Sequence, residues 1–225
     1  IKKKGSKVAD LKGRKITLVE LSVSHYLLAR ALDMNGMSER DVKLINTGDA
    51  DIAAIFTTDP NGAAVTWNPP LMQALRAPGA VRIFDSSDIP GEIIDLMVVR
   101  TDAPESLKKA LVGAWYEVME IMETKGPKRE KAIASMAQAS GGTVEEFKQQ
   151  LATTSLFYKA ADAVAFTAST KPKETMEQVR QFSYKKGLYG ESAPSADLVG
   201  IAFDDGSLLG DKNNIKLRFT TKYMQ

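Results

Sequence analysis

The sequence contains no cysteine and only one histidine, His25, among its 225 residues. The lack of thiols argues against thiol catalysis and thiolate metal sites, while leaving every redox compartment open. A single imidazole cannot form a histidine-rich metal site, and it makes a Ser-His-Asp triad unexpected. We therefore expect no catalytic centre, no metal and no other cofactor.

Long apolar runs and a large charge of one sign are absent as well. No stretch is long and apolar enough to cross a membrane, so we expect no direct membrane insertion. The net charge of +2 is too small to indicate nucleic acid as a partner, and the only basic run, Lys2–Lys4, has the character of a solvated linker. With 44% hydrophobic and 26% charged residues, the composition suits a folded protein of one or two domains.

The chain begins with Ile1 rather than with methionine. It shows no signal peptide, although a processed or trimmed chain would have lost one. We expect further residues upstream of Ile1.

The stretch 16–31 (ITLVELSVSHYLLARA) combines a short apolar strand, a serine-rich turn and the first turns of a helix. Ser22 and Ser24 are candidate N-caps of that helix. In open α/β sheets, ligands gather at the carboxyl ends of strands, where the first N–H groups of the next helix are unpaired. Glu20, Ser22, Ser24 and His25 therefore lie where this class of fold binds ligands. The two serines could equally serve as caps alone.

Strands and short helices alternate up to Arg100, which predicts a compact α/β domain with a mainly parallel sheet. The predicted strands are Ile16–Glu20, Val42–Asn46, Ala63–Thr66, Val81–Phe84 and Asp95–Val99. The predicted helices extend from the serine-rich turn to about Asn35, over Ala50–Thr57 and over Leu71–Leu75.

After Arg100 the pattern becomes helical, with predicted helices at Glu105–Thr124, Lys128–Ala139, from Thr143 onward and at Lys173–Lys186, and strand-like pieces at Val199–Phe203 and Ile215–Phe219. The first of these helices carries an apolar face on which we expect Trp115 to be a core residue. The part of the chain after Arg100 contains too few predicted strands for these helices to cover. We therefore expect them to pack on a sheet whose strands come from upstream of Ile1.

Several segments resemble the periplasmic substrate-binding proteins of ABC importers, in particular the taurine, aliphatic-sulfonate and nitrate binders and the related thiamine-pyrimidine group. They are DLKGRK, SVSHYLLARAL, DADIAAIF and VTWNP. Longer segments resemble the subgroup found with urea-carboxylase-type enzymes, which is thought to bind guanidine. These are VELSVSHYLLARALD, VTWNPPL, FDSSDIPGEIIDLMVV, GAWYEVM and VGIAFDDGSLLGDKNNIKLRFTTKYM. The resemblance spans essentially the whole chain.

The resemblance implies an α/β fold of the type II periplasmic-binding-protein class, with two lobes, open and mainly parallel sheets, and a ligand clamped between the lobes. Residues 1–98 would form the second lobe with a crossover strand at its end, and residues 99–225 the C-terminal helical part of the first lobe, whose N-terminal part is expected to be missing. The implied function is that of a periplasmic receptor, or an extracytoplasmic receptor tethered to the membrane in a Gram-positive host. Its partners would be a small ligand and an ABC transporter permease.

The sulfonate-binding relatives place an anion against the helix N-terminus that follows the first strand of this lobe. Here the corresponding turn begins with Glu20, and a carboxylate in a closing cleft would repel sulfonate or nitrate. It would suit guanidinium, whose planar fork of N–H donors matches a carboxylate at two points, or urea. The alternative is that Glu20 points away from the cleft, because successive strand residues face opposite sides.

Further candidates follow the other strands. Asp49 and Trp67 come at the ends of the second and third strands, and an indole face can hold a cation. Asn68 stands where relatives often have an acidic residue. The candidate ligand-binding residues are thus Glu20, Ser22, Ser24, Asp49, Trp67, Asn68 and Glu92. Simpler roles remain open for several of them: an N-cap for Asp49, core packing for Trp67 and a solvated loop charge for Glu92. We expect His25 to pack or cap rather than to contact the ligand.

Other functions occur on the same fold. A sulfonate or nitrate receptor is the nearest alternative. A thiamine-pyrimidine synthase would need a reactive cluster of histidine and cysteine, which a chain with one histidine and no cysteine cannot supply. The effector domain of a LysR-type regulator would need a helix-turn-helix upstream. We therefore expect a receptor for guanidine or urea, and not an enzyme.

Overall fold

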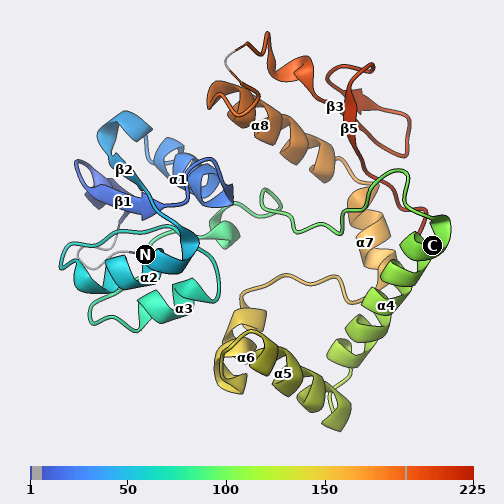
Figure 1. Cartoon of the computed structure of the whole chain (residues 1–225), viewed down its shortest axis with the longest axis horizontal. Coiled ribbons are helices and arrows are strands. Elements are labelled where there is room, and N and C mark those ends of the chain that lie inside the picture. The colour runs from blue at the N-terminus through green and yellow to red at the C-terminus, as the bar shows by residue number, and fades with distance from the viewer. Residues whose placement is uncertain (2–6, 191) are drawn as a thin grey trace. The chain divides into compact units, whose positions relative to one another are not determined.

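The computed structural model describes residue 1, residues 7–190 and residues 192–225. The basic run Lys2–Lys4 lies outside the described residues. The chain divides into two compact units, Ile1–Ile93 and Ile94–Gln225 (Figure 1). This boundary falls five residues before the one expected at residue 98. The assignment of the units to lobes of a receptor stays a prediction.

The sheet of the first unit is built around β1 (Lys15–Leu18), which pairs in parallel with β2 (Lys43–Asn46). The segment 63–65 flanks the other side of β1, where the Thr17 N–H donates to the Ala63 carbonyl at 3.0 Å and the Val65 N–H donates to the Thr17 carbonyl at 2.9 Å. All three segments run in the same direction. Their carboxyl ends therefore meet at one edge of the sheet.

Helices pack on both faces of this sheet because side chains alternate along β1. Ile16 and Leu18 are buried against α1 (Val23–Asp33). Val19 points the other way, into a second apolar cluster with α2 (Asp49–Thr58) and α3 (Pro70–Leu75). Figure 1 shows α1 and the pair α2 and α3 on opposite sides of the strands. Short 3-10 turns join these elements: η1 (Val8–Leu11), η2 (Glu39–Asp41) and η3 (Ser86–Asp88).

Two predicted strands are wrong in the described structure, and a third, Ala63–Thr66, is reduced to isolated bridges at Ala63 and Ala64. Residues 82–84 and 95–99 adopt no regular secondary structure. Ile83 and Phe84 pack their side chains on the cluster beneath α1, and Asp85 caps the turn that follows. Residues 96–99 are apolar and exposed. An apolar, β-branched sequence forms a strand only beside a neighbouring strand, and none of the described residues supplies one here.

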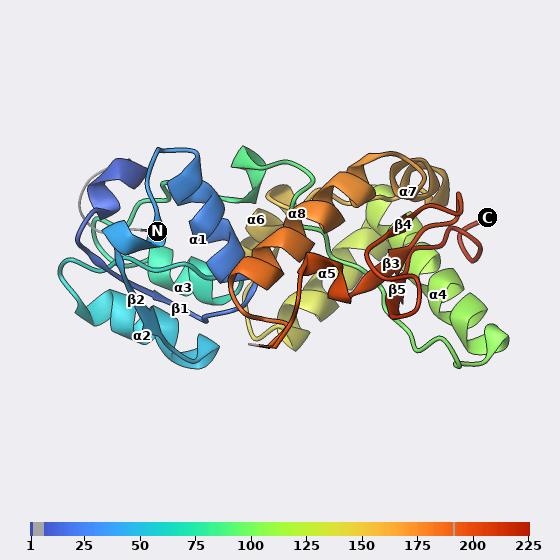
Figure 2. The ribbon, with the colours of Figure 1, turned by 90° about the horizontal axis from the view of Figure 1, so that it is seen from above.

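The second unit consists of helices followed by a small sheet. Its helices are α4 (Glu105–Glu123), α5 (Pro127–Ala139), α6 (Val144–Ala152), α7 (Ala160–Thr167) and α8 (Lys171–Lys185). After η4 (Ala196–Leu198), the strands β3 (Gly200–Ala202), β4 (Leu208–Leu209) and β5 (Ile215–Arg218) form a sheet in the order β4-β3-β5. The three strands lie together near the C-terminal end of the chain (Figure 2). The helices α4, α5, α6 and α8 and the strands β3 and β5 follow predicted segments within a few residues, whereas α7 and β4 are not predicted from the sequence.

Local chemistry explains several of these elements. The expected cap of α6 is present as a capping box: the Glu146 N–H donates to the Thr143 hydroxyl at 3.2 Å, and the Thr143 N–H donates to the Glu146 carboxylate at 3.0 Å. In α8, the buried Arg180 donates to the Ala196 carbonyl at 3.0 Å and to the Asp197 carboxylate at 2.5 Å. These two hydrogen bonds join α8 to η4.

The apolar face of α4 differs from the prediction. Met119 and Met122 are buried with Ile133 of α5, but Trp115 is 45% exposed, so its assignment to the core is wrong. The same face also exposes Leu107, Leu111 and Val118. Within the described part of the chain, no helix combines the length and apolar character needed to cross a membrane.

Candidate functional site

The turn after β1 is held by hydrogen bonds on every side. The Glu20 N–H donates to the Asn46 side-chain oxygen at 3.1 Å, which ties the turn to the end of β2. The Ser22 hydroxyl donates to the Val19 carbonyl at 2.7 Å and accepts from the Ser24 N–H at 3.1 Å. Ser22 is therefore the N-cap of α1. Whether either serine also contacts a ligand stays a prediction.

His25 completes this turn from inside α1. Its Nδ1 accepts a hydrogen bond from the Leu21 N–H at 3.0 Å, and its Nε2 lies 2.6 Å from the Glu39 carboxylate. His25 is 4% exposed. These contacts agree with the packing and capping role expected for it, and they leave no sign of direct ligand contact.

The start of α2 has a different character. Its N-cap is Gly48, which has no side chain to offer the helix. One carboxylate oxygen of Asp49, the first helical residue, is buried and has no hydrogen-bond partner among the described residues. Asp49 therefore does not act as the N-cap, the simpler role considered for it.

Two more buried oxygens without a described partner follow the segment 63–65. They are the Thr66 hydroxyl and the Asn68 side-chain oxygen. Asp49 follows β2, whereas Thr66 and Asn68 follow the segment 63–65, and these two segments flank β1 on either side. All three residues therefore lie toward the carboxyl edge of the sheet. An unsatisfied buried polar group costs about 1–3 kcal/mol. Such a concentration at a ligand-binding edge of this kind of sheet indicates hydrogen bonds that a bound molecule would complete.

Trp67 lies between these residues in sequence and is 38% exposed. Core packing, the simpler role considered for it, does not fit that exposure. The indole is therefore available to a flat or cationic group near the edge. Glu20 is half-buried.

Glu92 is held within the first unit by two residues of α1. The Tyr26 hydroxyl donates to its carboxylate at 2.7 Å, and the Arg30 guanidinium forms two hydrogen bonds with it, at 2.7 and 3.0 Å. Burial and the neighbouring Glu92 carboxylate raise the pKa of Tyr26, and the hydrogen bonds to Glu92 raise the pKa of Arg30. Glu92 is thus not a solvated loop charge. Its contact with a ligand stays a prediction.

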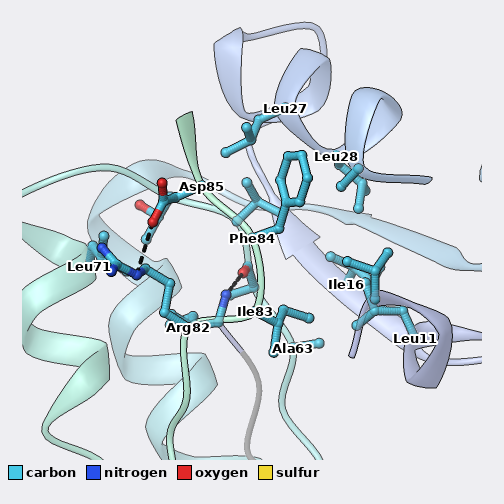
Figure 3. A pocket seen from close by; sticks show the side chains of 16 residues that line it. Leu11, Ile16, Leu27, Leu28, Ala63, Leu71, Arg82, Ile83, Phe84 and Asp85 are labelled. Carbon is cyan, nitrogen blue, oxygen red and sulfur yellow. Dashed lines mark hydrogen bonds and ion pairs between the residues drawn. The ribbon is translucent and has the colours of Figure 1, made fainter. Parts of the chain in front are cut away.

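A pocket of about 60 Å³, which the sequence analysis does not predict, lies beside β1 and α1. Its wall is mainly apolar, and Figure 3 shows the Phe84 ring directed toward Leu27 and Leu28 of α1. Arg82 and Asp85 also line it and bind each other at 2.9 Å. The volume suits a few water molecules rather than an organic ligand. We therefore place the candidate site at the sheet edge and not in this pocket.

Sequence reasoning missed Thr66, Asn46 and the partners of Glu92. Thr66 reads as an ordinary strand residue, yet it comes directly before Trp67 at the end of a strand, which was a usable signal. Arg30 is 62 residues from Glu92, so no local pattern could have paired them. Among the described residues, no group of three or more histidines and acidic residues could hold a metal ion.

Comparison with known proteins gives consistent relatives. The model of the family described as NMT1/THI5 like matches residues 2–114. A protein of Escherichia coli (strain K12), provisionally assigned as an aliphatic sulfonates-binding protein, is 30% identical over 134 residues, covering 60% of this chain and 42% of the relative. A provisionally assigned binding protein of Brucella abortus (strain 2308) is 29% identical over 136 residues, covering 57% and 42%. The chain thus spans about two fifths of the length of these relatives.

Two solved structures resemble the chain. The periplasmic aliphatic sulphonate binding protein SsuA from Escherichia coli matches with a TM-score of 0.53 and 24% identity, over 65% of this chain and 50% of the other. The alkanesulfonate-binding protein SsuA from Xanthomonas axonopodis pv. citri, bound to MOPS, matches with a TM-score of 0.54 and 20% identity, over 85% and 64%. These similarities show the fold: an α/β architecture consistent with part of a type II periplasmic binding protein.

Proposed function

Because the chain belongs to the NMT1/THI5 like family, we propose that it acts as a solute receptor of an ABC importer. It binds a small molecule outside the cytoplasmic membrane and delivers it to the transporter's permease. The compartment is the periplasm, or the outer face of a single membrane to which the receptor is tethered. The named relatives are binding proteins, and we expect no turnover of the bound molecule.

We infer that the ligand is a small planar nitrogen compound, guanidinium first and urea second. The observation that supports this most is the buried, unpaired carboxylate oxygen of Asp49. The Asn68 amide can present either its oxygen or its N–H group after a half turn, so it does not select a charge. A carboxylate only accepts hydrogen bonds, and it therefore requires a ligand with donors.

The turn after β1 adds to this preference. In an anion site at a helix N-terminus, free backbone N–H groups point at the anion. Here the N–H groups of Glu20, Leu21 and Ser24 are already bonded to side chains of the protein. The Glu20 side chain adds a negative charge at the same edge. Guanidinium would neutralise the carboxylates and stack its flat face on Trp67, at about 0.5–2 kcal/mol for the stacking.

A sulfonate is the alternative ligand class, because three of the named proteins are sulfonate-binding proteins according to their names. The two ligand classes differ in charge, so they make opposite demands on the carboxylates. Guanidinium needs Glu20 and Asp49 ionised, whereas a sulfonate would be repelled by both.

Calorimetry on the purified protein tests the proposal. Guanidinium, urea, taurine, an alkanesulfonate and nitrate would be titrated into wild type and into Glu20→Gln. We expect guanidinium to bind most tightly, urea more weakly and the anions not at all. Glu20→Gln should weaken guanidinium far more than urea, because only guanidinium carries the charge that the substitution leaves unmatched. Tight binding of taurine or an alkanesulfonate, without binding of guanidinium, would reject the guanidine proposal and leave a sulfonate receptor.

A further inference from the structure

We propose that His25 is a positioning residue for ligand binding, because its imidazole fixes the backbone turn that carries Glu20. The inference rests on the proposed function for the role of Glu20. The geometry of the turn does not depend on the identity of the ligand. His25 itself is buried and does not need to touch the bound molecule.

The turn contains a conformation that a leucine rarely adopts. Leu21 has φ of 61°, in the left-handed region that favours glycine. Its side chain is 51% exposed, so packing does not hold the residue in this conformation. The Leu21 N–H donates to His25 Nδ1 at 3.0 Å, and this hydrogen bond holds the residue in place.

The same peptide unit links this bond to Glu20. The Leu21 N–H and the Glu20 carbonyl belong to one rigid plane, so the imidazole sets the orientation of the backbone immediately after Glu20. Asn46 holds the other side of Glu20 through its N–H, at 3.1 Å. Glu20 is thus fixed from both directions, once by β2 and once by α1.

Glu39 in turn orients the imidazole. Because Nδ1 accepts from Leu21, the proton of the neutral ring is on Nε2, which then donates to the Glu39 carboxylate at 2.6 Å. Glu39 begins η2, the 3-10 turn before β2. The chain of contacts therefore runs from η2 through His25 to the turn at the sheet edge.

Loss of this contact should weaken binding by removing preorganisation. A turn that is mobile in the free protein must be ordered when the ligand binds, and that cost is subtracted from affinity. Fixing the backbone of one residue corresponds to a factor of about 5 to 30 in an equilibrium constant at room temperature. We expect a change of this size in Kd when the Leu21 bond alone is removed.

Two substitutions test the contacts of the two His25 nitrogens separately. His25→Asn keeps an acceptor at the position of Nδ1, two bonds beyond Cβ, and loses the contact with Glu39. His25→Gln reaches toward Glu39 and loses the acceptor for Leu21. Both replace a buried imidazole by an amide, so each is a matched control for the other in stability.

The experiment measures hydrogen exchange of the Leu21 amide by NMR and the Kd for guanidinium chloride, kept at concentrations too low to denature. We expect fast exchange and a Kd raised about 5- to 30-fold in His25→Gln. His25→Asn should retain slow exchange and a Kd close to that of wild type. If His25→Gln unfolds, Leu21→Gly is introduced into both wild type and His25→Gln, and the Kd values of these two proteins are compared. Glycine adopts the left-handed conformation without strain, so the turn no longer needs the bond to His25 in order to form.

Persistent protection of Leu21 in His25→Gln would overturn the proposal, as would equal losses of affinity in the Asn and Gln variants. If wild type does not bind guanidinium, the guanidine proposal fails. The exchange of the Leu21 amide still decides in that case whether His25 holds the turn. The two failures are therefore distinguishable.

Discussion

The helices α1 and α2 both begin at the carboxyl edge of the same small sheet, but their N-termini are built in opposite ways. At α1, Ser22 caps the helix, and the preceding N–H groups are bonded to Asn46 and His25. At α2, the cap is Gly48, and a buried oxygen of Asp49 has no described partner. The N-terminus of α1, which follows the central strand β1, is completed by the protein itself, and we call it the closed end. The positions on either side of it, Asp49 after β2 and Thr66 and Asn68 after the segment 63–65, have buried oxygens without described partners, and together we call them the open end.

This difference separates two tasks that a binding site must combine. The closed end gives the edge a fixed shape at little cost in stability, because its polar groups are satisfied. The open end reduces stability, because buried polar atoms lack partners, and it can recover that loss when a ligand supplies donors. Loss of a hydrogen bond at the closed end should therefore lower stability, and it should lower affinity only through lost preorganisation. Loss of a ligand contact at the open end should lower affinity directly.

The largest effect is expected at Asp49. Asp49→Asn keeps the shape of the side chain but removes its charge, and a hydrogen bond to a charged group contributes about 1.5–3 kcal/mol. We expect the Kd for guanidinium to rise by about 10- to 100-fold, measured by calorimetry. Asp51→Asn is the matched control, because Asp51 is an exposed carboxylate on the same turn of α2. Equal effects of the two substitutions would show that general charge, not a specific contact, governs binding.

Ser22→Ala tests the closed end. The substitution removes the hydroxyl that caps α1 and bonds to Val19, and loss of such a cap costs about 1 kcal/mol. We expect the free energy of unfolding to fall by about this amount in thermal unfolding without urea or guanidinium, because both are proposed ligands. Ser86→Ala is a useful control, because Ser86 is an exposed serine within η3 and not its N-cap. No loss of stability in Ser22→Ala would contradict the description of this end as closed.

Local sequence patterns predicted the elements of the edge well. Ile16 and Leu18 alternate with polar or outward residues, and Ser22 precedes an apolar helical stripe, so β1 and α1 could be placed within a few residues. Asp49 is a candidate because it follows a strand, and Asn68 because it stands where relatives often have an acidic residue. The structure adds that each of these residues has a buried side-chain oxygen without a described hydrogen-bond partner.

Features that depend on distant neighbours could not be predicted. The segments Val81–Phe84 and Asp95–Val99 have the composition of strands, but a strand requires another strand beside it. Trp115 lies on an apolar helical face, yet burial of that face depends on what covers it. The pairing of Glu92 with Arg30 joins residues far apart in sequence, and only the folded chain brings their charges together.

Thr66→Val tests how the open end affects the free energy of unfolding. Valine has nearly the shape of threonine but lacks the buried hydroxyl that has no described partner. Replacing an unsatisfied polar atom by an apolar one should raise the free energy of unfolding by up to about 1 kcal/mol, visible as a higher midpoint of thermal unfolding. Thr57→Val is the control, because the Thr57 hydroxyl already donates to the Ala53 carbonyl at 2.7 Å. A loss of stability in Thr66→Val would indicate that the hydroxyl is already satisfied.

The smallest effect concerns how far the closed end extends along α1. Burial and the Glu92 carboxylate raise the pKa of Tyr26 above its usual value near 10. A raised pKa means that the unfolded chain releases this proton first as pH increases. The contribution of Tyr26 to stability is therefore complete below pH 10 and is lost as the pH rises above it. Tyr26→Phe cannot ionise at this position, so its stability should decline less steeply above that pH, as measured by thermal unfolding across the alkaline range. Lysines and other tyrosines also titrate there, and the difference between the two proteins isolates Tyr26. Parallel pH profiles would show that the Tyr26 hydroxyl is not held by Glu92, and that the closed end stops at the first turn of α1.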